Sequence, residues 1–413
     1  MKVLIVATYL YIPTLKGFNR NKTGFGILLN QFTEYIGKRS ELYFFSNVIT
    51  PEVYHNNSII VRHTWWDIIS NISRADVLAG IKSALKSRQS FRNRLRYIYY
   101  RINCGALRAT ICQIRPDVIH CQGVGEKYLY YLKTCFKSGI PVVNTLHGLI
   151  GLSDSIKIDP EDKASELEYL NFALMNDVQT SVISTGILWK IQKSYQVNDS
   201  SLITVIPNGT KKEDQPIKYN IREKYGIPTK NKVILSVGSV CERKNQIQIV
   251  RSLAKLPAEI ISDITLLLLG AIQDGYNIQD VIIENELTET VICCGFVEYS
   301  KISSFYLNAD LNILASIDEG FGLSMIEGFL YGVPCLCYSD LDAVPDIYDE
   351  CAMFLCDQRT DIALSNSIKE ALEKSWNSKL IEEHGRKFSL ENMADKYIKF
   401  YGKAISKHSI NNE

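Results

Sequence analysis

Short apolar runs alternate with longer amphipathic stretches along most of this chain. The first two runs cover residues 3–9 and 41–47, and between them apolar residues recur at helical spacing from Leu28 to Ile36. Short apolar runs bounded by turn residues are typical of buried strands, and their alternation with helices indicates a parallel sheet. Further runs lie at residues 118–120, 141–148, 181–185, 203–209, 232–238, 264–269, 291–297, 311–315 and 334–338. We therefore predict an α/β fold.

The alternation is interrupted once, near the middle of the chain. Pro207-Asn208-Gly209 is a strong turn signal, and a polar run follows before the next strand begins at Lys232. A chain of 413 residues also suits two domains. We place the first domain at residues 1–209 and the second at residues 210–390, and we treat residues 391–413 as a terminal amphipathic helix.

Composition indicates in which compartment the protein works and which partners it has. The net charge of +1 gives no bulk attraction to nucleic acid. Eleven cysteines are scattered without any Cys-x-x-Cys pair, so we expect buried free thiols in a reducing compartment and hence a cytoplasmic protein. The apolar start at residues 1–7 lacks a convincing cleavage site, and we interpret it as the first strand. The sequence contains no apolar stretch long enough to form a transmembrane helix.

One segment departs from this balance of charge. Residues 77–116 contain nine Lys or Arg and no Asp or Glu. Its central basic residues are Lys82, Lys86, Arg88, Arg92, Arg94, Arg96 and Arg101, and the aromatic residues among or near them are Trp65, Trp66, Phe91, Tyr97, Tyr99 and Tyr100. Such a segment suits an anionic membrane surface, RNA, or simply water around a solvated helix. Because no RNA-binding motif accompanies it, we expect no nucleic-acid partner. Membrane docking through residues 82–101 and a solvated helix remain as alternatives.

The most informative stretch runs from Ala315 to Gly328. An apolar strand leads into a turn with two glycines, Gly320 and Gly322, and a helical pattern follows. This order of elements favours phosphate binding, because unpaired backbone N–H groups and the helix dipole attract an anion. Glu319 and Glu327 are eight residues apart, which on a helix would place both on one face. Beside a phosphate, these carboxylates suit the hydroxyl groups of a sugar; the alternative is a solvated helix start.

Three other strand ends carry candidate residues. Gly238 ends a strand and is followed by Arg243 and Lys244, which could clamp a diphosphate or form an exposed basic turn. His147 ends the strand at residues 141–148, where ligands of open α/β sheets bind. We interpret His120, at the end of another strand, as structural. Gly24 belongs to a glycine-containing loop after the first strand, which is either ligand-facing or a simple turn.

The stretch Glu319-Gly320-Phe321-Gly322-Leu323 with Glu327 resembles the signature of glycosyltransferase family 4. Members of that family are retaining, nucleotide-sugar-dependent enzymes of the GT-B fold, with two facing Rossmann-like domains. The resemblance covers nearly the whole chain, including Pro207-Asn208-Gly209, and is strongest from Val233 to Pro334. It implies parallel sheets in both domains and a C-terminal helix that crosses back to the first domain. The family often has an arginine directly after the strand-end glycine, where this chain has Ser239.

The resemblance also implies a role for each candidate residue. Lys244, with Arg243 in place of the missing arginine, would offset the diphosphate charge, and Glu327 would bind the ribose diol. Glu319 and His147 would act at the transferred sugar as the catalytic residues. The remaining implied donor-binding residues are Gly238, Val297, Phe321, Gly322, Leu323 and Ser324, and Gly24 would belong to a loop near the acceptor and the phosphates.

We therefore expect a retaining, metal-independent transferase that moves a hexose from a UDP- or GDP-sugar to a glycan or lipid-linked acceptor. The nucleotide sugar is a co-substrate, and no cofactor is expected. Synthesis of a cell-envelope polysaccharide such as O-antigen or capsule fits this expectation by analogy with the family. Two alternatives stay open. One is a related GT-B epimerase or inverting transferase, and the other is a catalytically weak nucleotide-sugar-binding subunit of an envelope assembly complex.

Overall fold

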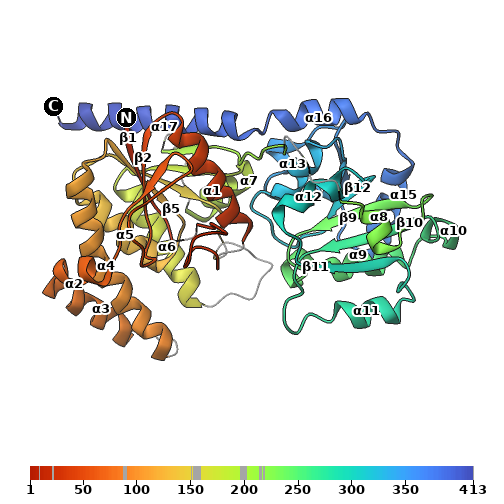
Figure 1. The fold of residues 1–413 in the computed structure, drawn as a ribbon, viewed down its shortest axis with the longest axis horizontal. Helices are drawn as coiled ribbons and strands as arrows, with labels where there is room; N and C mark the ends of the chain where they lie inside the picture. Colours follow the sequence, from red (N-terminus) through yellow and green to blue (C-terminus); the bar gives the residue numbers. More distant parts are fainter. Residues whose placement is uncertain are drawn as a thin grey trace. The chain divides into compact units, whose positions relative to one another are not determined.

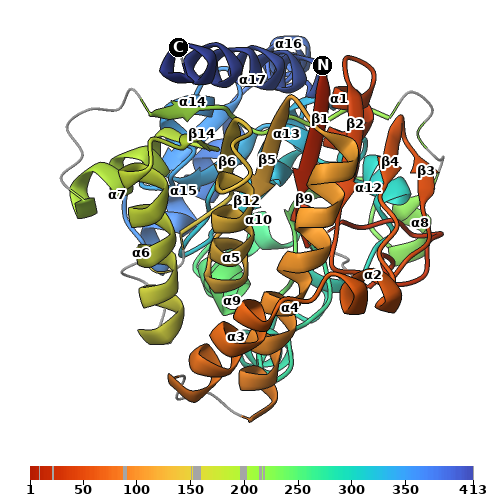
Figure 2. The same cartoon turned by 90° about the vertical axis from the view of Figure 1, so that its left-hand side faces the viewer.

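The computed structural model describes residues 1–8, 10–20, 23–86, 91–149, 151, 160–195, 202–213, 216 and 219–412. The chain divides into two compact units, drawn in Figures 1 and 2. Unit 1 comprises Met1–Ile183, Ile187–Pro207 and Leu390–Glu413, and unit 2 comprises Ser184–Gly186 and Asn208–Ser389. Within the described part of the chain, no helix is both long and apolar enough to cross a bilayer.

Unit 1 is built on one eight-stranded sheet with the strand order β3-β4-β2-β1-β5-β6-β7-β8. Its strands are β1 (Lys2–Val6), β2 (Glu41–Phe45), β3 (Val53–His55), β4 (Ser58–Ile60), β5 (Val118–Gln122), β6 (Val142–Leu146), β7 (Gln179–Val182) and β8 (Ile203–Val205). All neighbouring pairs are parallel except β3 and β4. Strands β1, β5 and β6 are almost completely buried, as expected for a sheet covered by helices on both faces.

The helices of unit 1 include one that returns from the end of the chain. They are α1 (Gly24–Gly37), α2 (Trp65–Ser70), α3 (Arg74–Lys86), α4 (Phe91–Ile114), α5 (Glu126–Phe136), α6 (Pro160–Met175), α7 (Thr185–Tyr195) and α17 (Leu390–Asn412). Helix α17 packs on α1 and against β5 and β6. Its Tyr397 and Tyr401 are fully buried there. Helix α3 packs mainly on α4, and the pair extends away from the sheet (Figures 1 and 2).

Unit 2 contains a six-stranded, wholly parallel sheet with the strand order β11-β10-β9-β12-β13-β14. Its strands are β9 (Lys232–Val237), β10 (Ile264–Leu269), β11 (Val291–Gly295), β12 (Leu311–Leu314), β13 (Cys335–Tyr338) and β14 (Met353–Cys356). Its helices are α8 (Ile221–Tyr225), η2 (Glu242–Lys244), α9 (Gln246–Leu253), α10 (Ala258–Ile261), α11 (Ile278–Glu284), α12 (Tyr299–Tyr306), α13 (Leu323–Phe329), α14 (Val344–Ile347), α15 (Asp361–Glu373) and α16 (Ser378–Arg386). The predicted α/β class with parallel sheets is confirmed.

The strand order of unit 2 reverses direction between β9 and β12. Counted from its first strand, the sheet has the doubly wound order 3-2-1-4-5-6. In such sheets, ligands bind beyond the carboxyl ends of the strands at the point where the order reverses. The loops that follow β9 and β12 therefore occupy the position where a ligand is expected.

Strand β14, the hairpin of β3 and β4, and the grouping of residues 184–186 with unit 2 were not predicted from the sequence. A short hairpin joins β3 to β4, and its turn residues Asn56 and Asn57 have φ values of 48° and 59°. Two adjacent residues at positive φ form the tight turn that suits a two-residue hairpin, and asparagine tolerates this conformation. Residues Ser184–Gly186 group with unit 2, because Thr185 donates its N–H and its hydroxyl to the Asp346 carboxylate, each over 2.6 Å.

Candidate functional site

The loop after β9 positions two adjacent cations. Gly238 follows the strand with a φ of +134°, a value that favours glycine. A Cβ atom at this position would lie 3.2 Å from Cε of Lys244, so the glycine leaves room for the lysine to fold back over the loop. Arg243 and Lys244 lie in the short turn η2, and Asn245 then leads into α9.

The loop after β12 is tied to the loop after β9. Ser316 is fully buried, and Ile317 donates its backbone N–H to the carbonyl oxygen of Arg243 over 2.8 Å. Gly322 ends the loop with a φ of +73°, and a Cβ atom there would lie 2.5 Å from Cε of Met325. The backbone conformation therefore favours glycine at position 322, and a larger residue would also force the end of the Met325 side chain to shift.

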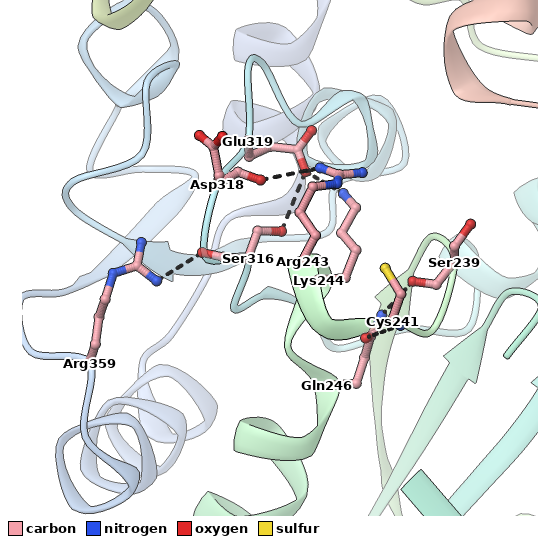
Figure 3. A network of polar contacts seen from close by, with 9 residues as sticks. All are labelled: Ser239, Cys241, Arg243, Lys244, Gln246, Ser316, Asp318, Glu319 and Arg359. Atoms are coloured by element: carbon pink, nitrogen blue, oxygen red, sulfur yellow. Dashed lines mark hydrogen bonds and ion pairs between the residues drawn. The ribbon is translucent and has the colours of Figure 1, made fainter. Parts of the chain in front are cut away.

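Glu319 receives both cations, as Figure 3 shows. Its Oε2 lies 2.5 Å from Nζ of Lys244 and 3.1 Å from Nη1 of Arg243. Nη1 of Arg243 also donates to the backbone carbonyl of Asp318 over 3.2 Å. Burial alone would raise the pKa of the Glu319 carboxyl, but the charges of Lys244 and Arg243 outweigh it and hold that pKa below its usual value. Glu319 is therefore ionised, and the two cations lie side by side.

Glu327 lies in α13 in a different environment. The hydroxyl oxygen of Tyr306 lies 3.3 Å from Oε2 of Glu327 and 3.1 Å from the carbonyl oxygen of Ser324, and its one proton is shared between these two acceptors. Burial raises the pKa of Glu327 to about 7, against smaller opposing effects of the Tyr306 hydrogen bond and the Lys244 charge. Glu319 lies in the loop before α13, so the helical spacing from which the sequence argument placed both carboxylates on one face is wrong. Lys244 instead acts electrostatically on both.

Arg359 supports the loop after β12, and no sequence pattern had indicated this role. Its Nη1 donates to the carbonyl oxygen of Ser316 over 2.9 Å (Figure 3). Its Nε and Nη2 donate to the carboxylate of Asp340 over 2.9 Å and 2.7 Å. The guanidinium also lies 4.3 Å from the ring centroid of Tyr338. Arg359 thus holds the residue three positions before Glu319 from the side opposite Lys244.

One sequence pattern is typical of metal-binding sites. Asp340 and Asp342 have an Asp-x-Asp spacing, which occurs once in the chain. The carboxylate of Asp340 is occupied by Arg359, and the Cα of Asp342 packs closely against Gly186. Within the described ranges, no group of three or more His, Cys, Asp and Glu residues is arranged to hold a metal ion.

Unit 1 contains the other candidate residues, His147 and Gly24. His147 follows β6, and its Nε2 lies 2.5 Å from Oε1 of Gln122 at the end of β5. The ring of Phe25 packs on the imidazole with centroids 4.3 Å apart. Burial lowers the pKa of His147 to about 3, so the ring is neutral at physiological pH. Gly24 begins α1, and a Cβ atom there would meet no described atom within 4 Å.

The remaining predicted donor residues are more enclosed. Phe321 is almost completely buried, so only its backbone is available to a ligand. Ser324 is buried and Leu323 is half-buried. Val297 follows β11 and packs on the hydrophobic cluster between the sheet and α12. His120 is fully buried and hydrogen-bonded to Tyr401 and Thr145.

The basic segment, residues 77–116, includes most of α3 and all of α4. Arg88 lies outside the described residues, as do the side chains of Lys86 and Arg92. Arg101 packs inward, with its guanidinium 3.6 Å from the ring centroid of Tyr130. The large exposed apolar side chains of this region are Trp65, Trp66, Ile69, Ile72, Leu78, Ile81, Leu85, Phe91 and Leu95. We call these nine residues the apolar patch.

Part of the chain matches a known protein family. Residues 218–388 match the family model described as glycosyl transferases group 1. The matched region contains Lys244, Glu319 and Glu327, and it lies within unit 2.

Individual proteins resemble the chain over a longer range. Alpha-monoglucosyldiacylglycerol synthase of Streptococcus pneumoniae is 25% identical over 310 residues, which cover 71% of this chain and 68% of that protein. Sucrose-phosphate synthase from Thermosynechococcus elongatus superposes with a TM-score of 0.74 at 16% identity, covering 98% of this chain and 99% of the other. Anabaena Alr3699/HepE, solved in complex with UDP and glucose, superposes with a TM-score of 0.65 at 16% identity, covering 98% of this chain and 100% of the other. The two superpositions support the fold described above.

Proposed function

We propose that the chain, whose residues 218–388 match the family model described as glycosyl transferases group 1, is a GT-B glycosyltransferase that transfers a hexose with retention of anomeric configuration. The donor is a nucleotide-diphosphate sugar, either a UDP- or a GDP-sugar. The acceptor is a glycan or a lipid-linked saccharide of a cell-envelope polysaccharide such as O-antigen or capsule. No cofactor or metal ion takes part.

The observation that supports this proposal most directly is the convergence of Lys244 and Arg243 on Glu319. A departing nucleoside diphosphate develops negative charge, and preorganised cations at that point give the largest electrostatic stabilisation available to a transferase. An entering diphosphate competes with Glu319 for the two cations. The carboxylate then becomes available to sugar hydroxyl groups or to the positive charge that develops at the anomeric carbon.

The other candidate residues bind different parts of the donor. Glu327 binds the ribose diol, while the backbone around Phe321, Gly322, Leu323 and Ser324 donates to the phosphates and Gly238 allows their close approach. The backbone beside Val297 holds the nucleotide base. In unit 1, His147 binds a hydroxyl of the transferred sugar, and the loop at Gly24 lies near the acceptor and the phosphates. Each of these roles is part of the proposal.

The apolar patch leads us to propose docking on an anionic membrane surface. Trp65, Trp66 and Phe91 are 60%, 73% and 77% exposed, and Lys82 on α3 and Arg96 on α4 are exposed as well. Exposed aromatic residues combined with basic residues favour the interface of an anionic bilayer. The relative from Streptococcus pneumoniae is named for a glycolipid product, which agrees with a lipid acceptor. Docking would place the enzyme on the inner face of the cell membrane.

The membrane proposal is tested by sedimentation with vesicles of phosphatidylcholine and with vesicles that also contain phosphatidylglycerol. We expect binding to the anionic vesicles only, and loss of binding in Trp65→Ser/Trp66→Ser and in Lys82→Gln/Arg96→Gln. Trp189→Ser is the control, because Trp189 is also exposed, at 56%, but lies in α7. Equal binding by wild type and both double variants would exclude docking through this patch.

The donor proposal is tested by thermal shift against UDP-, GDP-, ADP- and TDP-sugars, followed by transfer to a lipid-linked acceptor. A donor present at about 100 times its dissociation constant stabilises the protein by about 2.7 kcal/mol. We expect one nucleotide class to stabilise the wild type but not Glu327→Ala. NMR of the product then reads the anomeric configuration, and inversion would exclude a retaining reaction.

A second candidate function is favoured by Ser239. Ser239 follows Gly238 at the position where the family that the sequence resembles often has an arginine. The expected diphosphate clamp is weaker without that arginine. A nucleotide-sugar-binding subunit with little activity is the resulting alternative. Donor binding without turnover in the presence of acceptor would support it.

A further inference from the structure

A series of buried hydrogen bonds in unit 1 leads from the backbone of β6 to His147. The hydroxyl of Ser181 donates to the backbone carbonyl of Asn144 over 3.3 Å. Oγ of Ser181 lies 2.6 Å from Oγ of Thr145. Either hydroxyl can donate in this pair, and Oγ of Thr145 also lies 3.2 Å from the Tyr397 hydroxyl.

The next member of the series is His120. Its Nε2 lies 2.7 Å from Oγ of Thr145. Burial holds the pKa of His120 well below its usual value, so the ring is neutral and carries one proton. The amino group of Gln122 lies 3.3 Å from Nδ1 of His120 and can only donate, so Nδ1 is the acceptor and Nε2 carries the proton. The Tyr401 hydroxyl of α17 donates to this Nδ1 over 2.7 Å.

Gln122 joins the two histidines. Its amino group lies 3.3 Å from Nδ1 of His120, and its Oε1 lies 2.5 Å from Nε2 of His147. An amide oxygen can only accept, so Nε2 of His147 carries a proton and donates a hydrogen bond to Oε1.

This arrangement leaves one nitrogen of His147 without a partner. A neutral imidazole carries one proton, so Nδ1 of His147 is an acceptor. Nδ1 is buried and has no hydrogen-bond partner among the described residues. Phe25 packs on the ring and restricts its rotation. A buried acceptor without a donor is unfavourable by itself and indicates a group that arrives with a ligand.

We propose that Gln122 is a positioning residue that fixes His147 as the Nε2–H tautomer, so that Nδ1 accepts a hydrogen bond from a hydroxyl group of the bound sugar. The ligand part of this inference rests on the proposed function, whereas the tautomer does not. The polarity is specific, because Nδ1 accepts from a hydroxyl and repels a carbonyl or ether oxygen. A donor lacking that hydroxyl leaves Nδ1 unpaired and is discriminated against.

The tautomer is tested by long-range ¹⁵N–¹H NMR of protein labelled at histidine, with His147→Asn used to assign the His147 signals. We expect a protonated Nε2 in the wild type and in Gln122→Glu, which keeps an acceptor at this position. In Gln122→Met we expect the Nδ1–H tautomer to become populated. A protonated Nδ1 in the wild type, or an unchanged tautomer in Gln122→Met, would overturn the proposal.

Kinetics test the consequence for transfer. Losing one correctly oriented hydrogen bond is expected to lower kcat/KM about tenfold in Gln122→Met. We expect a smaller loss in Tyr401→Phe and none in Tyr131→Phe, a matched control whose buried hydroxyl has no hydrogen-bond partner among the described residues. Equal loss in Tyr401→Phe and Tyr131→Phe would reduce the series to a structural role. Absence of any transfer by the wild type would count against the proposed function and leave the NMR result standing.

Discussion

Nζ of Lys244 lies 2.5 Å from Oε2 of Glu319, and the two residues follow the neighbouring strands β9 and β12 at the point where the strand order reverses. Both side chains are largely buried, at 11% and 14% exposure, so the charges interact at a low local dielectric. Arg243 joins them from the neighbouring position on η2. A fixed group of two cations and one anion is thus assembled before any ligand binds.

We expect Lys244→Met to lower kcat by about 10²–10³, because removing one preorganised electrostatic group at the leaving diphosphate has a cost of this order. Glu319 keeps Arg243, so the free energy of unfolding should fall by only about 1–3 kcal/mol. Lys301→Met is the control, since Lys301 forms an exposed pair with Glu298 on α12. Transfer rates measured with saturating donor check the effect, and an unchanged kcat would exclude Lys244 from the chemistry.

We expect Glu327 to make donor binding depend on pH near neutrality. Its pKa is raised from 4.5 to about 7 by burial, so the folded protein holds a proton that the unfolded chain releases earlier. The free energy of unfolding should therefore fall by roughly 3 kcal/mol as the pH rises from the lower to the higher value. Donor affinity should rise through the same range, because the carboxylate accepts from both ribose hydroxyls.

These two pH profiles are compared in wild type, Glu327→Gln and Glu370→Gln. Urea unfolding measures stability, and fluorescence titration with a nucleotide sugar measures affinity. Glu327→Gln should flatten both profiles, whereas Glu370→Gln, at an exposed position of α15, should match the wild type. A pH dependence that survives in Glu327→Gln would show that another group titrates.

Gly322→Ala should destabilise the protein by more than about 2 kcal/mol, since it adds the cost of a positive φ to a close approach. Its Cβ atom would lie 2.5 Å from Cε of Met325 and 2.9 Å from Cδ2 of Leu314. Gly275→Ala is a matched control, because Gly275 has a φ of +79° and no atom within 4 Å of the added carbon. That variant should lose only about 1 kcal/mol. Equal losses in the two variants would show that packing around Gly322 adjusts freely.

Arg359→Lys should lower kcat/KM about tenfold, because a lysine keeps the charge but cannot hold Asp340 and the Ser316 carbonyl at once. The loop that presents Glu319 is then less firmly placed. Arg386→Lys provides the comparison, since Arg386 makes an exposed pair with Glu382 on α16. Steady-state kinetics with a nucleotide sugar separate the variants. If Arg359→Lys retained full activity, the support from Arg359 would be unnecessary for transfer.

Several elements of the fold could be predicted because they depend on local pattern. The apolar run from Leu311 to Leu314 became β12, and the glycine at position 322 ended the loop before α13, as expected. The Asn56-Asn57 hairpin also has a local signal, a pair of residues that tolerate positive φ between two short apolar runs. It was missed because those runs are only three residues long.

Other features depended on residues far apart in the sequence. Adjacency could not show that Arg243 and Lys244 point the same way, because a short turn rather than a regular helix or strand sets their directions. The contact of Arg359 with Ser316 joins residues 43 positions apart, and that of His120 with Tyr401 joins residues 281 positions apart. Contacts between residues so far apart in the sequence leave no periodic pattern from which they could be predicted.

By itself, the sequence determined most of the strands, the glycine loops and the residue types of the candidate site, because these follow from local burial and backbone conformation. The tertiary structure alone decided which charges converge on Glu319 and how burial shifts the pKa of Glu327. It also decided which polar groups orient His147. The physical reason is that electrostatic effects and hydrogen bonds act through space, and only the packing of strands β9, β12, β5 and β6 sets those distances.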